Sequence, residues 1–277
     1  MTQLQILHRW SEVFHLDNVV RTSHHAGGTS DADLRLDDLG IEVLPMLGPM
    51  LYFWIRHGLE YRRPYADGVE GILIPVKPFG ESKKRLSSLL TQQQRRRLSL
   101  AMVADVLRAT EKWPNRLLVT SDPDAEAVGL AFGCELVPDL GQGLNAAIAF
   151  GTLKAIEMGI TSLLVLPSDV PLVNSDDIAF LFADPHEVVV APSNDGGTNA
   201  LRRCPPDAIQ PAFGPSSARA HEASAVEAGL GFKMIDRESL LFDVDRYEDL
   251  EALAGDGRQL ESVKVASVLI GQSRVGG

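Results

Sequence analysis

Between residues 70 and 192, short runs of apolar residues alternate with segments that have helical spacing. The run Ile72–Val76 is continuous, as expected of a strand that is buried on both faces. Strands are expected at 72–76, 116–121, 135–138, 162–167 and 187–192, and helices at 91–111, 124–133, 145–158 and 175–182. Strands that alternate with helices form parallel βαβ units. The sequence therefore predicts an α/β fold, a three-layer sandwich with a mostly parallel sheet.

The composition changes near residue 70. Five of the seven histidines lie before it, whereas the first lysine is Lys77. We therefore divide the chain into an N-terminal extension of unknown role (1–69), a main domain (70–255) and a C-terminal tail (256–277). A lid, an oligomerisation arm and a poorly ordered extension all remain open for 1–69. The oligomeric state is also open, and a homodimer is one option.

The charge balance limits the classes of partner. The chain carries a formal net charge of −11, which argues against a protein that coats nucleic acid. The most apolar window, 39–55, contains Glu42 and two prolines and is too broken for a membrane span. The whole chain has two cysteines, which are too few for a disulfide framework. These features favour a soluble, cytoplasmic protein with no membrane partner.

Four cations follow the first predicted strand: Lys77, Lys83, Lys84 and Arg85. Lysine point charges and a planar guanidinium are suited to a polyphosphate. The loop is not a Walker A motif, because no Gly-Lys-Ser/Thr ends it. A solvated basic loop is the alternative interpretation.

Two further loops follow strands and carry polar groups. After the third strand, Gly143 exposes its backbone and Asn145 begins a helix, so these residues could hold a nucleobase or a ribose, or Asn145 could simply cap the helix. After the fourth strand, Asp169 stands between two prolines. Ligands bind beyond the carboxyl ends of parallel strands, which places Asp169 where a divalent cation could bind.

A second acidic position lies near the end of the main domain. Asp243 and Asp245 are two residues apart, so both side chains face the same way on an extended segment. Together with Asp169 they form a candidate Mg²⁺ site. The alternative interpretations are a turn or cap residue for Asp169 and an exposed strand edge for Asp243 and Asp245. A glycine turn at Phe213–Ser217 leads into another helix, whose N-terminus could bind an anion. His221 on that helix is interpreted as structural rather than catalytic.

Six motifs, in this order and spacing, resemble the CofC/FbiD family, the 2-phospho-L-lactate or phosphoenolpyruvate guanylyltransferases of coenzyme F-420 biosynthesis. The resemblance covers about residues 70–255. The motifs are 74–78 with 83–86, Gly143–Asn145, Pro167–Leu172, Gly197–Leu201, Phe213–Ser217 and Asp243–Asp245. This sequence departs from the family at Arg246-Tyr247, where the family has Thr-Pro, and at 195–198, where it has Gly-Thr-Gly-Thr.

The resemblance implies a nucleotidyltransferase of the nucleotide-diphospho-sugar transferase fold type, which acts on GTP and a three-carbon phospho-acid. That acid is 2-phospho-L-lactate, phosphoenolpyruvate or 3-phospho-D-glycerate. In this interpretation Asp169 holds Mg²⁺ together with Asp243 and Asp245, of which either one could be the second ligand, and Gly143 and Asn145 hold the guanosine. Lys77, Lys83 and Arg85 neutralise the triphosphate, and with Asp169 they are the candidate catalytic residues. Thr198, Gly214 and Ser217 hold the acceptor.

Two other functions are compatible with the sequence. A GT-A type glycosyltransferase shares such a sheet and an Asp-x-Asp metal motif, but here that motif lies near the end of the chain. A non-catalytic GTP-binding sensor would bind the nucleotide without forming a product.

Overall fold

The computed structural model describes residues 68–80 and 83–275, and side chains up to residue 272. All of them belong to one compact unit, Tyr65–Gly277. The predictions for the N-terminal extension lie outside the described residues. None of the helices in the described ranges combines the length and apolar character that a crossing of the bilayer requires.

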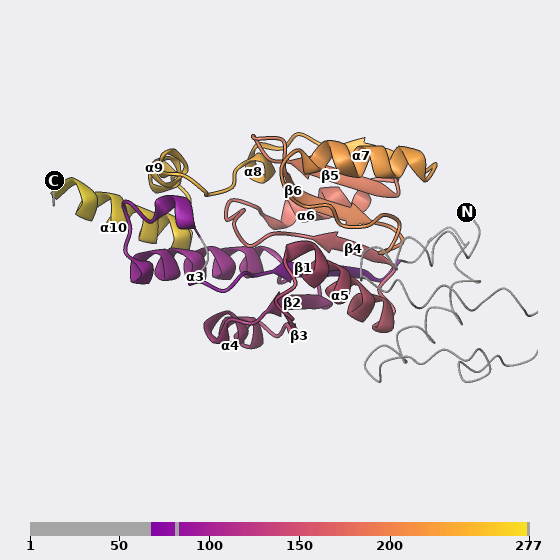
Figure 1. The fold of residues 1–277 in the computed structure, drawn as a ribbon, viewed down its shortest axis with the longest axis horizontal. Helices are drawn as coiled ribbons and strands as arrows, with labels where there is room; N and C mark the ends of the chain where they lie inside the picture. Colours follow the sequence, from indigo (N-terminus) through magenta and orange to yellow (C-terminus); the bar gives the residue numbers. More distant parts are fainter. Residues whose placement is uncertain (1–67, 81–82, 276–277) are drawn as a thin grey trace, which may run out of the picture. The chain divides into compact units, whose positions relative to one another are not determined.

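The described residues form one mixed sheet of seven strands with the order β3-β2-β1-β4-β6-β5-β7 (Figure 1). Neighbouring strands are parallel except at β6, which runs antiparallel to β4 and β5. The strands are β1 (Glu70–Pro75), β2 (Arg116–Thr120), β3 (Glu135–Pro138), β4 (Ser162–Val165), β5 (Val188–Pro192), β6 (Thr198–Arg203) and β7 (Phe232–Met234). The predicted α/β sandwich with a mostly parallel sheet is confirmed.

Helices cover both faces of this sheet. Alternate residues of β1 point to opposite sides: Ile72 and Ile74 pack with α3, α4, α6 and α8, whereas Leu73 packs with α5 and α7. The helix bounds are α3 (Gln92–Ala109), α4 (Pro123–Ala131), α5 (Leu144–Glu157), α6 (Ser175–Ala183), α7 (Ser217–Glu227) and α8 (Glu238–Leu241). The first of these begins at the expected capping box of Thr91 and Gln94. The sheet core is therefore closed on both faces, and polar side chains can gather only at its edges.

Strand β6 was not predicted from the sequence, although the motif Gly197–Leu201 covers its first residues. All six of its residues are buried, including Arg202 and Arg203. Because β6 is antiparallel to β4 and β5, its amino end lies at the same sheet edge as their carboxyl ends. Thr198, the first residue of β6, therefore lies at the edge where the loops after β1, β3 and β4 begin.

After α8 the chain forms two more helices, α9 (Tyr247–Gly255) and α10 (Glu261–Val275). Both pack with α3 around a third apolar cluster, at one end of the described unit (Figure 1). The buried Asp105 carboxylate on α3 accepts hydrogen bonds from the backbone N–H groups of Glu261 and Ser262 at 3.1 and 2.7 Å. The segment expected as a C-terminal tail thus contains a helix that is capped by a side chain from α3.

Candidate active site

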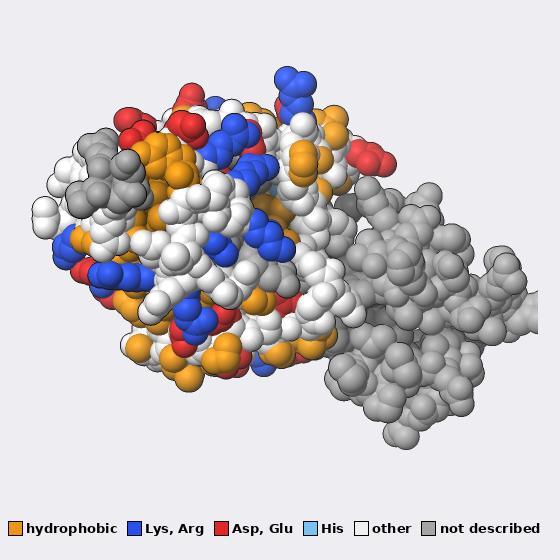
Figure 2. Space-filling view, turned by 60° about the vertical axis from the view of Figure 1, so that its left-hand side comes forward, with side chains coloured by type: hydrophobic (Ala, Val, Ile, Leu, Met, Phe, Trp, Pro, Cys, Tyr) orange, Lys and Arg blue, Asp and Glu red, His pale blue; other side chains and the backbone are white. Residues whose placement is uncertain are grey.

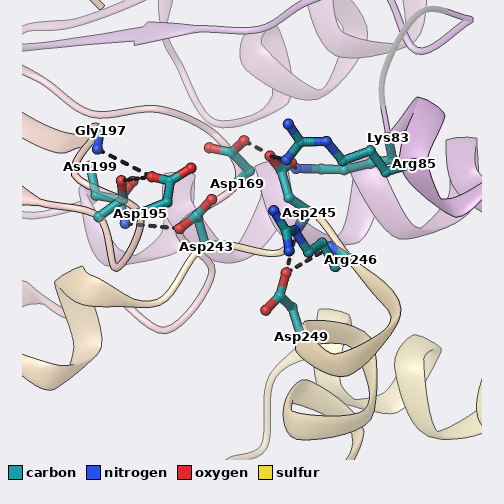
Figure 3. Close-up of polar contacts among 11 residues, drawn as sticks. Lys83, Arg85, Asp169, Asp195, Gly197, Asn199, Asp243, Asp245, Arg246 and Asp249 are labelled. Carbon is teal, nitrogen blue, oxygen red and sulfur yellow. Dashed lines mark hydrogen bonds and ion pairs between the residues drawn. The ribbon is translucent and has the colours of Figure 1, made fainter. Parts of the chain in front are cut away.

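A buried lysine lies at the centre of the polar sheet edge. Lys83 Nζ is 3.0 Å from Asp169 Oδ2 and 3.0 Å from Asp245 Oδ1, and its side chain is only 6% exposed (Figure 3). The backbone of Lys83 is left-handed, with φ 51°. Arg85 stands beside this group with Nη1 3.6 Å from Asp245 Oδ2. The structure therefore brings the cationic loop into contact with the two acidic motifs that were grouped from the sequence as a candidate metal site.

The charges of this group stabilise one another. Burial alone would lower the pKa of Lys83, but Asp169 and Asp245 together raise it above its usual value. Burial alone would raise the pKa of Asp169, but the ammonium groups of Lys83 and Lys77 lower it. Lys83 is thus held as a cation and Asp169 as an anion.

Asp243 has a different partner from Asp245. Its Oδ1 accepts a hydrogen bond of 3.4 Å from the Asn199 amide on β6. Burial and the nearby charge of Asp169 raise the pKa of Asp243 to about 6. Between the two acidic residues, the buried Val244 donates its N–H to the Asp169 carbonyl at 3.1 Å. This bond fastens the acidic segment to the loop after β4, although 243–245 is not part of a sheet strand.

The carboxylates fit a small hard cation that shares its ligands with a substrate. In the part of the chain that the structure describes, no three His, Cys, Asp or Glu side chains form a group that could hold a metal by themselves. Asp169 and Asp245 nevertheless converge on one point, and the ammonium of Lys83 fills that point. Mg²⁺ usually takes one or two carboxylates and completes its shell with water and phosphate oxygens.

A cavity of about 160 Å³ adjoins the Lys83 group. It is lined by the loop after β1, the side of α3 and the start of α5, and its lining includes Lys77, Phe79, Met102, Leu144 and Asp169. Gly143 precedes α5 with φ 93°, a left-handed conformation that favours glycine. The cavity thus has apolar walls and cationic and acidic groups at one end, a combination suited to a nucleoside phosphate.

Asn145 is directed toward a backbone segment. Its Nδ2 donates to the Phe213 carbonyl at 3.0 Å, and its Oδ1 accepts from the Phe213 N–H at 2.7 Å. These two hydrogen bonds join the first turn of α5 to the loop before α7. The role expected for Asn145, contact with the guanosine, stays a prediction, and the structure adds a positioning contact that the sequence could not reveal.

The three residues expected to bind the acceptor lie close to the start of α7. Thr198 Oγ1 is 2.8 Å from Ser217 Oγ, and both residues are buried. Gly214, with φ 148°, and Ser216, with φ 56°, turn the chain sharply into α7. The N-terminus of this 11-residue helix carries partial positive charge. Hydroxyl groups and a helix N-terminus together form a surface that suits an anion.

Two residues near this surface were not selected as binding residues. His221 is fully buried and contacts Thr198, and burial lowers its pKa to about 4. Asp195 accepts hydrogen bonds from Ser193 Oγ at 2.5 Å and from the Gly197 N–H at 3.1 Å, and these bonds lower its pKa (Figure 3). The His221 result agrees with its interpretation as structural. Asp195 lies in the segment 195–198, where the sequence departs from the family pattern, and its hydrogen-bond partners are known only from the fold.

Exposed cations lie at the site although the whole chain is acidic: Lys77 lines the cavity, and Arg85 lies beside Asp245. On the face shown in Figure 2, several Lys and Arg side chains lie around the centre of the visible surface. The net charge of the full chain is −11. A local group of cations can attract an anionic ligand against such a net charge.

The chain is similar to a family of guanylyl transferases. The family model described as "Guanylyl transferase CofC like" matches residues 70–265. A phosphoenolpyruvate guanylyltransferase of Conexibacter woesei is 37% identical over 190 residues, which cover 65% of this chain and 85% of that protein. A 2-phospho-L-lactate guanylyltransferase of Methanothermobacter thermautotrophicus is 34% identical over 182 residues, 64% of this chain and 81% of that protein.

Solved structures show the same fold. A protein of Desulfovibrio desulfuricans, provisionally designated a nucleotide-diphospho-sugar transferase, superposes with a TM-score of 0.63 at 18% identity, covering 75% of this chain and 98% of that one. A nucleotidyl transferase of Methanothermobacter gives a TM-score of 0.51 at 14% identity, covering 68% and 96%. The fold type expected from the motifs is confirmed.

Proposed function

Because this chain belongs to the family of CofC-like guanylyl transferases, we propose that it transfers GMP from GTP to a three-carbon phospho-acid and releases pyrophosphate. Relatives named for phosphoenolpyruvate and for 2-phospho-L-lactate support such an acceptor. 3-Phospho-D-glycerate is the third candidate. We place the reaction in coenzyme F-420 biosynthesis, in keeping with the resemblance of the motifs.

The observation that carries the proposal is the position of Lys83 between Asp169 and Asp245, all three of which line the cavity. A guanylyl transfer brings two anions together, the triphosphate of the donor and the phosphate of the acceptor. An enzyme for this reaction must neutralise charge and align the reacting groups. The cationic loop and the paired carboxylates supply both requirements in one place.

We further propose that Asp169 and Asp245 hold Mg²⁺, with Asp243 close enough to assist. When bound, the ion would neutralise phosphate charge and help to align the donor with the acceptor. Lys83 would then exchange a carboxylate partner for a phosphate oxygen of GTP. Lys77 and Arg85, both exposed at the same edge, would bind the β- and γ-phosphates and stabilise the departing pyrophosphate.

The acceptor needs no strong general base. Its phosphate has a second pKa near 6 and is largely doubly ionised at neutral pH. One phosphate oxygen attacks the α-phosphorus of GTP, the bond from that phosphorus to the α,β-bridging oxygen breaks, and pyrophosphate leaves. Thr198, Gly214, Ser217 and the α7 N-terminus would hold the acceptor's carboxylate or phosphate during this step.

The test is to incubate the purified full chain with GTP, MgCl₂ and each of the three acids separately, and to measure pyrophosphate. We expect pyrophosphate and a guanylylated acid in equal amounts with at least one acid, and no reaction when EDTA is present. ATP and CTP serve as control donors.

The same assay separates the other two functions. A glycosyltransferase would release a nucleoside diphosphate from a sugar nucleotide and no pyrophosphate. A sensor would bind GTP without forming any product. Either outcome would contradict the proposed transfer.

A further inference from the structure

Two buried hydroxyls and an imidazole form a short hydrogen-bonded chain beside the acceptor surface. The Ala212 N–H donates to His221 Nε2 at 2.9 Å. His221 Nδ1 lies 3.2 Å from Thr198 Oγ1, which in turn is 2.8 Å from Ser217 Oγ. The exposed fractions are 0% for His221, 7% for Thr198 and 1% for Ser217. Water is therefore largely excluded from these hydrogen bonds, so the groups themselves determine which atom carries each hydrogen.

The backbone fixes the direction of the first bond. An N–H group can only donate, so Nε2 of His221 must be the acceptor and must carry no proton. A neutral imidazole then has its proton on Nδ1. Burial, with the charge of Arg203 as a smaller cause, lowers the imidazole pKa to about 4, so the ring is neutral near pH 7. His221 consequently donates from Nδ1 to Thr198.

Because His221 donates to Thr198, one hydroxyl proton of the Thr198–Ser217 pair has no acceptor among these three side chains. Thr198 and Ser217 have two hydroxyl protons, and only one of them can lie between the two oxygens. Because His221 donates, it accepts neither of them. Among the described residues no other side-chain partner of the two hydroxyls is recorded. If the imidazole were the other tautomer, Nδ1 would accept the remaining proton and the pair would have none to offer.

We propose that His221 is a positioning residue which, through its tautomer, makes the Thr198–Ser217 pair a hydrogen-bond donor to an anionic oxygen of the phospho-acid. The proposal rests on the proposed function, since it takes these hydroxyls as part of the acceptor site. A buried O–H without an acceptor is costly, and an oxygen of the acid's phosphate or carboxylate would satisfy it. His221 itself does not contact the substrate in this arrangement.

The test compares three variants of the full chain by their KM for the acid, their KM for GTP and their kcat. His221→Phe keeps a ring but removes both nitrogens, and we expect it to raise the KM for the acid about tenfold with little change in the KM for GTP. His221→Asn can donate from its amide to Thr198 and should restore most of the loss. Ser217→Ala should raise the KM for the acid, and His221→Phe should add little in that background.

The outcomes separate this proposal from the proposed function. If Ser217→Ala leaves the KM for the acid unchanged, the acceptor site itself is wrongly placed. If Ser217→Ala raises this KM but His221→Phe does not, the role of His221 alone is wrong. Equal rises in both KM values would also overturn it, because they would indicate a general structural effect.

A measurement on the unchanged protein covers the case in which the Phe variant does not fold. The ¹⁵N chemical shifts of the His221 imidazole report which ring nitrogen carries the proton. We expect protonation at Nδ1 near pH 7, both without and with bound acid. A proton on Nε2 would overturn the proposal, whatever the kinetics of the variants.

Discussion

Lys83 Nζ lies 3.0 Å from Asp169 Oδ2, although 86 positions separate the two residues in the chain. This contact connects the cationic loop after β1 with the acidic loop after β4. Both loops leave the carboxyl ends of adjacent parallel strands, which pair through Glu70–Leu73 and Ser162–Val165. The ammonium group of Lys83, which the proposed reaction uses, therefore lies between the carboxylates that would hold a metal.

Asp169→Asn should remove most of the turnover and leave the fold intact. The amide keeps the shape and an oxygen that can accept from Lys83, but it loses the negative charge that Mg²⁺ requires. We expect kcat to fall at least a thousandfold, or about 4 kcal/mol in the activation free energy. The measurement is the rate of pyrophosphate release, with Asp176→Asn on α6 as the control. Full activity of Asp169→Asn would remove the metal role from this residue.

Lys83→Ala should weaken the use of GTP and destabilise the ligand-free protein. Without the ammonium, Asp169 and Asp245 repel each other across the vacated position. We expect kcat/KM for GTP to fall at least tenfold, or about 1.4 kcal/mol. The Tm should drop at low salt and recover when MgCl₂ is added. Lys84→Ala, an exposed cation next to it, is the matched control, and equal effects of the two variants would argue for a nonspecific charge effect.

Asn145→Ala should act on the acceptor side more than on the nucleotide side. The substitution removes both hydrogen bonds to the Phe213 backbone and loosens the loop that leads to Ser217. We expect a loss of about 1 kcal/mol in the free energy of unfolding and a several-fold rise in the KM for the acid. Steady-state kinetics with each substrate varied in turn is the measurement. A rise in the KM for GTP alone would instead support the predicted contact with the guanosine.

The contribution of His221 to the stability of the protein should fall as the pH drops from about 6.5 to about 4. Its pKa is lowered to about 4 in the fold, whereas an unfolded histidine has a pKa of about 6.5. Between these values the unfolded chain binds a proton that the fold excludes. The stabilisation is therefore complete above 6.5 and is lost toward 4, to a total on the order of 3 kcal/mol.

Urea unfolding at several pH values checks this prediction by comparing the wild type with His221→Asn. The groups around the ring include Thr198, the Ala212 N–H, Arg203 and the ring of Phe213, and they are the same in both proteins. The difference between the two curves should shrink as the pH falls through this window. A constant difference would show that His221 titrates normally in the fold.

Regular periodicity made much of the sheet predictable. Strands β1 to β5 are apolar runs, and each of them was expected close to its observed place. Strand β6 was missed because two arginines lie in its last positions. Arg202 donates to carbonyl groups of Leu181 and His186, and Arg203 donates to the Ile209 carbonyl and to Thr152 Oγ1. Three of these four acceptors lie 16 to 51 positions away, so residue spacing does not indicate that guanidinium groups could be buried there.

That the site residues lie at one edge of the sheet could be predicted from the rule that ligands bind at the carboxyl ends of parallel strands. The contacts between these residues could not be predicted in this way. Asp169 and Lys83 could be placed at one edge because their loops follow parallel strands. That Lys83 would lie between two carboxylates depends on a left-handed backbone in its loop. Likewise, the contact between Asn145 and Phe213 depends on how α5 and the loop before α7 are packed. Neither packing nor loop conformation can be obtained from residue spacing.

The cap that α3 provides for the last helix has a practical consequence for anyone who shortens the gene. A chain cut after Gly255 would keep Asp105 and its ion pair with Arg108 but lose the two backbone N–H groups that donate to the buried carboxylate. It would also uncover apolar side chains on α3 and α9 that α10 now shields from water. Such a truncated protein should aggregate on expression, even though every residue proposed to touch GTP or the acid would still be present.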